Sequence, residues 1–301
     1  MLKINKKRYS PGGIVLLIFL GLVDLALLIT YLLHGKNVAL FNTKGFIAEQ
    51  QLSLMVLTIA VLLAIAIPTL FVLFFTAWKY RESNTKALHV PNARHGKFFV
   101  LSIWLIPTVF MLFLAFVMLP ATQRLAPQKL IAADAKPLRI QVISMRWKWL
   151  FIYPDQEIAT VNFVQVPVGT PVQFELTADA APMSSFWIPN LGGQLYSMTG
   201  HVNRLNLMAD TPGDYTGSSA EINGAGFAGM KFTARASSVE DFGRWVQEVK
   251  RSPDVLDAAT YANVLEPSEN NPTAFYSAFE SGLYDKVVMK YMGPTEGKMQ
   301  H

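Results

Sequence analysis

The chain has 301 residues, of which 51% are hydrophobic and only 16% are charged. Soluble domains usually carry about a quarter charged residues, so this balance indicates a membrane protein. The chain has no cysteine, which excludes disulfides, zinc–thiolate sites, iron–sulfur clusters and cysteine nucleophiles, and its net charge of +5 invites comparison with nucleic-acid-binding proteins.

Three long apolar segments predict membrane-spanning helices. They cover residues 14–33, 52–78 and 98–119, and Asp24 is the only charged residue within them. About 20 helical residues cross the apolar core of a bilayer, so each segment is long enough. Asp24 is either a proton or quinone contact or, as we favour, a neutral or hydrogen-bonded residue that faces a neighbouring subunit.

The basic residues predict the orientation in the membrane. Nine lie before the first segment or between the second and third: Lys3, Lys6, Lys7, Arg8, Lys79, Arg81, Lys86, Arg94 and Lys97. The connection after the first segment has only Lys36 and Lys44. By the positive-inside rule, the N-terminus is cytoplasmic and everything after residue 119 is external. The first segment is either a cleaved signal peptide or, because no clean small-residue cleavage site follows it, a retained anchor.

This distribution of charge explains the basic character of the chain. Residues 1–119 carry eleven Lys and Arg against three acidic residues, whereas residues 120–301 carry fifteen against eighteen. The positive charge is therefore a signal of topology, and it gives no support to nucleic-acid binding.

After residue 120 the pattern changes to short alternating segments that predict β-strands. From Ile143 to Tyr153 every second residue is large and apolar, and shorter alternations recur at 172–176, 205–207 and 230–232 between turns rich in Pro, Gly and Asp. Such spacing predicts a β-sandwich. Ser238 is expected to cap a helix that ends before Pro253, and residues 254–292 look helical and aromatic-rich. These aromatic residues either form a partner-binding surface or belong to helices packed on the sandwich, and we favour packing within the complex.

Three stretches resemble subunit II of the haem–copper terminal oxidases. Residues 144–153 (SMRWKWLFIY) resemble the aromatic entry strand of that family, residues 184–192 (SSFWIPNLG) the loop that begins its copper site, and residues 217–230 (GSSAEINGAGFAGM) its second ligand loop. The resemblance runs from about residue 39 to residue 292. It is closest to the quinol-oxidising branch, the bo-type ubiquinol oxidases, whose aromatic-rich C-terminal extension the last part of the chain also resembles.

The resemblance allows the copper ligands to be checked position by position. The branch that oxidises cytochrome c holds two coppers through two Cys, two His, a Met and a Glu backbone carbonyl. The matching residues of this chain are Ser184, Ser219, Glu221, Asn223, Phe227 and Met230. Copper sites of this kind need thiolates and imidazoles, so we expect no copper centre here.

The resemblance implies a non-catalytic structural and assembly subunit of a proton-pumping respiratory quinol oxidase that reduces oxygen to water. Haems and one copper are then expected in subunit I, ubiquinol is the substrate of the complex, and this chain holds no catalytic residue, metal or cofactor. The implied partners are subunit I, subunits III and IV and membrane lipid, without cytochrome c or nucleic acid. The implied location is the bacterial inner membrane, multi-pass, with the C-terminal domain periplasmic.

Several residues depart from the family pattern or allow two interpretations. Lys36 occupies the cysteine position of a stretch that resembles a lipobox. Val100 occupies the position at which family members often carry a Glu near the entrance of a proton channel. Glu49 lies too near the outer surface, in the predicted topology, to take the place of that Glu. Trp147 and Trp149 are interpreted as core and interface aromatics, because electron entry would need copper beneath them.

Two polar residues of the external domain remain. For His201 an ordinary polar contact is favoured over metal binding, and Glu221 either bonds within its loop or contacts subunit I.

The predicted fold class is a membrane α plus β protein: transmembrane helices, then a cupredoxin-like antiparallel β-sandwich, then a short helical extension. The predicted divisions are residues 1–51 with the first helix, 52–119 as a helical hairpin, 120–236 as the sandwich without copper, and 237–301 as the extension. The alternative function is a stand-alone, membrane-anchored, degenerate cupredoxin-like binding module. A copper-containing cytochrome c oxidase subunit is excluded by the ligand substitutions.

Overall fold

The computed structural model describes residues 24, 38–82, 84–86, 96–133 and 135–292. The chain divides into two units, residues 1–38 with 55–118 and residues 39–54 with 119–301. The predicted first helix lies outside the described residues except for Asp24, which is helical and exposed.

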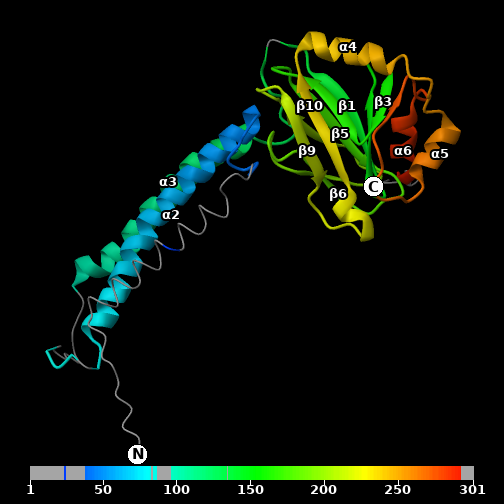
Figure 1. The fold of residues 1–301 in the computed structure, drawn as a ribbon. Helices are drawn as coiled ribbons and strands as arrows, with labels where there is room; N and C mark the ends of the chain where they lie inside the picture. The colour runs from blue at the N-terminus through cyan, green and yellow to red at the C-terminus, as the bar shows by residue number, and fades with distance from the viewer. Residues whose placement is uncertain (1–23, 25–37, 83, 87–95, 134, 293–301) are drawn as a thin grey trace, which may run out of the picture. The chain divides into compact units, whose positions relative to one another are not determined.

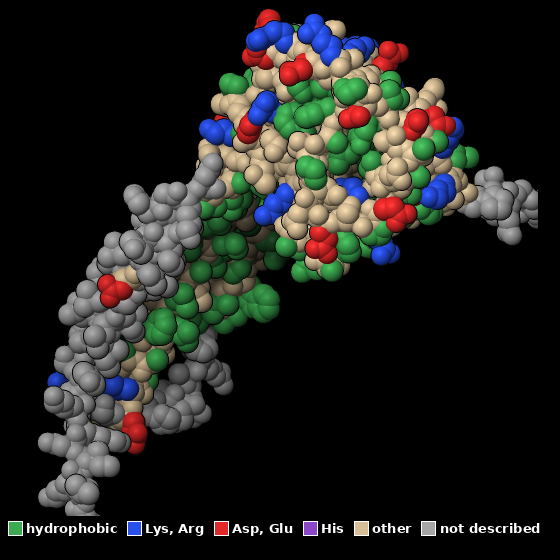
Figure 2. All heavy atoms as spheres, turned by 45° about the vertical axis from the view of Figure 1, so that its right-hand side comes forward, with side chains coloured by type: hydrophobic (Ala, Val, Ile, Leu, Met, Phe, Trp, Pro, Cys, Tyr) green, Lys and Arg blue, Asp and Glu red, His purple; other side chains and the backbone are tan. Residues whose placement is uncertain are grey.

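Two helices are long and apolar enough to cross a membrane. They are α2 (Phe46–Lys79) and α3 (Lys97–Arg124), each extending a few residues beyond the predicted apolar segment. Their most apolar stretches bury no side chain, and Phe98 and Phe116 are 89% and 81% exposed. Figure 2 shows hydrophobic side chains covering the visible surface of these helices. Apolar surface on this scale needs apolar surroundings, as a bilayer provides.

The second unit is built on two β-sheets, and it confirms the predicted fold class (Figure 1). One sheet has the order β11-β3-β2-β1-β5-β8 and the other β4-β10-β9-β6-β7. The strand bounds are β1 Leu138–Met145, β2 Lys148–Tyr153, β3 Ile158–Val161, β4 Phe163–Pro167, β5 Val172–Ala178, β6 Ser184–Trp187, β7 Leu195–Ser197, β8 Asn203–Leu207, β9 Gly213–Ser219, β10 Lys231–Ser237 and β11 Ala274–Tyr276.

The strand pairing differs from the prediction in one respect, because the sandwich is not purely antiparallel. The pairs β1–β5 and β4–β10 are parallel. Three strands separate β1 from β5 in the chain, and five separate β4 from β10. Connections of this length let the later strand return in the same direction, whereas strands joined by a tight hairpin must be antiparallel.

The aromatic stretch from Ile143 to Tyr153 forms a hairpin and not one strand, which corrects the prediction. Met145 pairs with Lys148, and Trp147 in the turn has φ 64°. Two-residue hairpin turns require positive φ, and the sequence gives no glycine or asparagine to signal it. Because of the turn, Ile143 packs in a different core cluster from Trp149.

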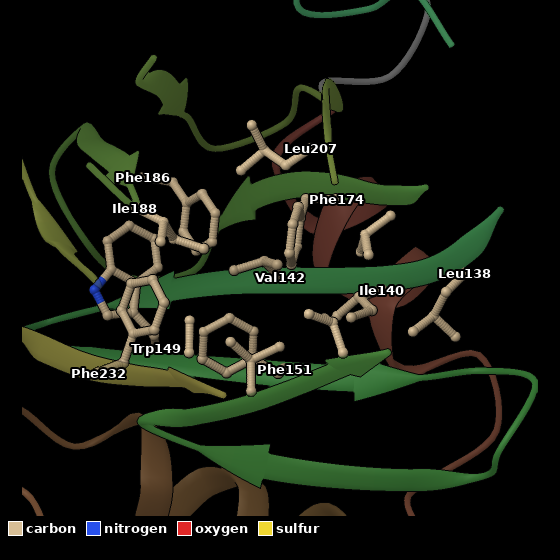
Figure 3. Packing of buried hydrophobic residues seen from close by; sticks show 14 of the residues in the cluster. Leu138, Ile140, Val142, Trp149, Phe151, Phe174, Phe186, Ile188, Leu207 and Phe232 are labelled. Carbon is tan, nitrogen blue, oxygen red and sulfur yellow. The ribbon is translucent and has the colours of Figure 1, made fainter. Parts of the chain in front are cut away.

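The core between the sheets is aromatic (Figure 3). The ring of Phe186 stacks on Phe232 at 5.1 Å between centroids, and Trp149 meets both rings edge-on at 5.3 and 5.9 Å. The ring centroids of Phe174 and Phe186 also lie 5.1 Å apart, with the rings tilted. Tilted and edge-to-face pairs of this kind stabilise a core beyond the area they bury.

The C-terminal extension starts with the predicted helix and then departs from the prediction. Helix α4 (Val239–Val249) is capped by Ser238, whose side chain accepts from the Asp241 N–H at 3.0 Å. Beyond Pro253 the chain is not continuously helical: α5 (Ala258–Leu265) and α6 (Leu283–Tyr291) flank β11, which pairs with β3. The buried aromatics Tyr261, Tyr276 and Tyr284 of the extension pack against the sheet, so helices packed on the sandwich are found, and packing within a complex stays a prediction.

Candidate functional site

Three of the six ligand-like positions meet in a buried hydrogen-bonded cluster. Asn223 donates from Nδ2 to the Ser184 hydroxyl at 2.8 Å and to the Met230 sulfur at 3.1 Å. Ser184 comes from β6, Asn223 from the loop after β9, and Met230 follows a short 3₁₀ helix, Ala225–Gly229. All three side chains are buried. The side-chain amide thus connects positions that are up to 46 residues apart, so that the loop closes on itself.

The other three positions lie around this cluster with separate contacts. Ser219 donates to the backbone carbonyl of Glu221 at 2.9 Å. The Glu221 carboxylate accepts from the Tyr196 hydroxyl of β7 at 3.5 Å, the upper limit of a hydrogen bond. Phe227 is half-buried in the 3₁₀ helix. The Glu221 side chain therefore contacts a neighbouring strand, whereas the two predicted roles were a bond within its own loop and a contact with subunit I.

Comparison with known proteins places the chain in a family. The model of the cytochrome c oxidase subunit II periplasmic domain matches residues 155–237, and that of the COX aromatic-rich motif matches residues 250–295. The cytochrome bo(3) ubiquinol oxidase subunit 2 of Pseudomonas putida is 42% identical over 297 residues, 99% of this chain and 91% of the relative. The chain belongs to the ubiquinol oxidase subunit 2 family.

A second curated relative agrees with this family membership. The ubiquinol oxidase subunit 2 of Acetobacter aceti is 40% identical over 275 residues, which is 89% of each chain. Among solved structures, the periplasmic domain of subunit II of the cytochrome oxidase of Bradyrhizobium japonicum matches 40% of this chain and 96% of its own length. Its identity is 23% and its TM-score 0.37, so it adds nothing to the argument from sequence.

The residues of this chain do not fit a two-copper centre. The six positions offer two serine hydroxyls, an amide, a thioether, a phenyl ring and a glutamate, and none of them is a thiolate or an imidazole. Both hydrogens of one amide nitrogen are already engaged with Ser184 and Met230. Within the described part of the chain, no group of three or more His, Cys, Asp or Glu is placed to hold a metal.

The two tryptophans of the hairpin have different environments. Trp149 lies in the core, as predicted. Trp147 is half-buried and lies over the loop that carries Asn223: a Cβ at Gly226 would come within 2.4 Å of its indole ring. Only glycine at position 226 allows this close approach, so Trp147 closes the loop from outside.

The predicted polar role of His201 is also found. Its Nδ1 lies 3.1 Å from the Thr199 carbonyl oxygen, and the side chain is exposed. Contacts of Lys36 lie outside the described residues. Val100 is an exposed residue of α3.

A buried carboxylate that the sequence did not single out joins the extension to the sandwich. Asp179 accepts from Lys290 at 2.8 Å, from the Tyr291 hydroxyl at 2.7 Å and from the Tyr261 hydroxyl at 2.6 Å. Burial alone would raise the pKa of Asp179, but these three hydrogen bonds and the Lys290 charge hold it below its usual value. Its role is structural, and no sequence pattern marks it, because its partners lie more than 80 residues away.

Proposed function

We propose that this chain is the non-catalytic structural and assembly subunit II of a proton-pumping respiratory quinol oxidase that reduces oxygen to water. Family membership rests on relatives named ubiquinol oxidase subunit 2 that match nearly the whole chain. The observation that carries the proposal is the cluster of Ser184, Asn223 and Met230. An amide there makes hydrogen bonds at positions where the cytochrome c-oxidising branch needs metal ligands.

The consequence for electron transfer follows from this chemistry. A chain without thiolates or imidazoles at these positions has no group that accepts an electron from cytochrome c. Electrons then enter through ubiquinol in a partner subunit, where the haems and one copper reside. The proposed partners are haem–copper oxidase subunit I, subunits III and IV and membrane lipid.

The proposed location is the bacterial inner membrane, multi-pass, with a cytoplasmic N-terminus. Two exposed apolar helices support an anchor, and the match to a periplasmic-domain model supports an external sandwich. The proposed divisions remain 1–51, 52–119, 120–236 and 237–301. The degenerate positions Ser184, Ser219, Glu221, Asn223, Phe227 and Met230 hold the loops closed and bind no metal.

Affinity purification through a tag on this chain tests the proposal. We expect a haem-containing partner to co-purify and the preparation to oxidise ubiquinol with oxygen. An untagged strain carried through the same steps is the control. A preparation that oxidises reduced cytochrome c independently of quinol, or two coppers per copy of this chain by metal analysis, would contradict it. A monomer without haem would instead favour the stand-alone binding module.

A further inference from the structure

The halves of α2 and α3 nearest the loop that joins them are exposed on all sides. Every residue from 67 to 82 is exposed, and of residues 96–109 only Ser102 is half-buried. Elsewhere in the two helices Val61 is buried and Met118 is half-buried. The exposed halves therefore present their side chains to the surroundings of the chain.

Aromatic side chains are prominent on these exposed halves. Phe71 and Phe75 of α2 stack with their ring centroids 6.1 Å apart, and the ring of Trp78 lies 6.0 Å from that of Phe75. On α3 the side chain of Trp104 is 72% exposed. Apolar surface of this kind fits the hydrocarbon core of a bilayer, and tryptophan is common where that core meets the headgroups. Acyl chains are therefore the surroundings that suit these side chains.

Two cations lie over aromatic rings at the end of this apolar surface. The Lys79 ammonium is 5.8 Å from the ring centroid of Phe75 and 5.6 Å from that of Tyr80. The Arg81 guanidinium is 5.7 Å from the ring centroid of Trp78. A cation within about 6 Å of a ring face is attracted to it. The rings therefore hold positive charge where the apolar surface ends, which is the level of the headgroup phosphates.

The charge at this end of the helices is not balanced within the described residues. Residues 79–97 contain five Lys or Arg and one acidic residue, Glu82. No described carboxylate forms an ion pair with Lys79, Lys86 or Lys97. Helix α3 begins at Lys97 and has no acidic residue in its first turn. Clusters of about four to eight basic residues next to a membrane helix attract anionic lipids.

The type of lipid follows from this charge. The positive-inside rule explains on which side of the membrane the basic residues lie, but in the described part of the folded chain their charge still lacks a counterion. An anionic phospholipid supplies both the acyl chains that suit the aromatic surface and the negative headgroup that suits the cations. A zwitterionic phospholipid adds an ammonium group of its own, which the basic residues repel.

We propose that the exposed halves of α2 and α3 bind anionic phospholipid in preference to zwitterionic phospholipid. Lys79 and Lys97 contact headgroup phosphates, and the acyl chains lie against Phe71, Trp78 and Trp104. In the proposed topology this lipid belongs to the cytoplasmic leaflet. The proposal narrows the membrane lipid named under the proposed function to one charge class, so it rests on the proposed membrane location and not on the assignment to an oxidase.

Quenching of tryptophan fluorescence by brominated lipid tests this preference. Trp78 and Trp104 lie in α2 and α3, whereas the other four tryptophans lie in the second unit of the chain. The full chain is placed in nanodiscs of phosphatidylcholine that contain an equal share of either dibrominated phosphatidylglycerol or dibrominated phosphatidylcholine. We expect stronger quenching by the phosphatidylglycerol. The excess should disappear in about 1 M salt, where the screening length falls to about 3 Å.

The double variant Lys79→Gln/Lys97→Gln should lower the ratio of the two lipid association constants by a factor of about five or more, because each basic residue near an anionic surface contributes about that factor. The matched control is Arg124→Gln/Lys129→Gln, which removes the same charge at the other end of α3. Its ratio should equal that of the original chain, because Trp78 and Trp104 lie toward the opposite end. All four positions are exposed, so both variants should keep the circular dichroism of the original chain.

Two results overturn the proposal: equal quenching by the two lipids, or an equal ratio for the double variant and the original chain. Failure of the proposed function is distinguishable, because the tagged purification is read by haem and oxidase activity and not by quenching. Preferential quenching by phosphatidylglycerol in a chain without a haem partner would contradict the oxidase assignment and still support the lipid preference.

Discussion

Gly217 of β9 packs directly against the aromatic core. A Cβ at this position would lie 2.0 Å from the ring of Phe232, which stacks on Phe186. A side chain at 217 would therefore push Phe232 out of its place between the sheets. Gly243 of α4 provides the matched contrast, because a Cβ there meets nothing within 4 Å.

We expect Gly217→Ala to destabilise the external domain by about 1–3 kcal/mol, the usual cost of overpacking a core. Gly243→Ala should stabilise it by up to about 1 kcal/mol, because alanine is the better helix former. Denaturant unfolding of the purified chain, followed by tryptophan fluorescence, measures both. Equal denaturant midpoints for Gly217→Ala and the original chain would show that Phe232 can move without lowering the free energy of unfolding.

Lys148 is a buried cation that forms hydrogen bonds with the C-terminal end of α5 and the residues that follow it. Its ammonium donates to the carbonyls of Val264 and Glu266, both at 2.8 Å, and to the Ser268 hydroxyl at 2.5 Å. Burial lowers the pKa of Lys148, and the charge of Glu266 opposes this. Three acceptors at the end of one helix explain why a lysine tolerates a buried strand position.

Replacing Lys148 by methionine keeps the length of the side chain and removes all three bonds. The unpaired carbonyls should cost about 2 kcal/mol or more. Hydrogen exchange should increase mainly in residues 258–268, because the bonds end there. Lys231→Met, on an exposed position of β10, is the control and should leave that exchange unchanged. A uniform increase over the whole sandwich would contradict a local role for Lys148.

Among the secondary-structure elements, features that depend on residues nearby in the sequence were predicted correctly, and features that depend on distant residues were not. The cap by Ser238 depends on neighbours within one turn, and the structure confirms it. Strand β11 exists because Ala274–Tyr276 pairs with β3 more than 110 residues earlier, and no periodicity in three residues announces this. The hairpin at Trp147 was missed because positive φ in a tryptophan is set by packing over Gly226.

The attachment of α6 through Asp179 should depend on pH. The pKa of Asp179 is lower in the folded chain than in the unfolded one, so its contribution is complete above the ordinary aspartate pKa, about 3.9, and is lost as pH falls through the folded value. We therefore expect proteolytic cleavage within residues 283–291 to accelerate below about pH 4.

Asp179→Asn should give faster cleavage already at neutral pH, because the charge that Lys290 contacts is absent. Its cleavage rate should also change less with pH than that of the original chain. Asp155→Asn, which changes an exposed carboxylate, serves as the control. Identical pH profiles for Asp179→Asn and the original chain would exclude Asp179 as the group responsible.

For the whole molecule, the sequence located the degenerate ligand positions but not what they do. Resemblance aligned Ser184, Asn223 and Met230 with metal ligands, whereas their hydrogen bonds depend on the rotamer of one amide in a folded loop. Gln141, Glu175 and Arg204 likewise become neighbours only through the register of three strands, which no pattern in the sequence shows. Resemblance to a family identifies the aligned positions in a sequence, but the contacts between strands of a sheet are known only from the folded structure.

The proposed topology has a direct test, because the chain has no cysteine of its own. Single substitutions Lys86→Cys, between α2 and α3, and Glu240→Cys, in α4, place one thiol on each side of the membrane. Both positions are exposed. A membrane-impermeant maleimide added to right-side-out spheroplasts should label Glu240→Cys fully and Lys86→Cys only after the membrane is permeabilised.

The unsubstituted chain is the blank in both conditions, since it offers the reagent no thiol. The expectation follows from charge: Lys79, Arg81 and Lys86 adjoin the apolar segments on the side that the positive-inside rule assigns to the cytoplasm. Labelling of Lys86→Cys in intact spheroplasts would reverse the orientation of both helices. The sandwich would then face the cytoplasm, and the external location proposed from the family match would be wrong.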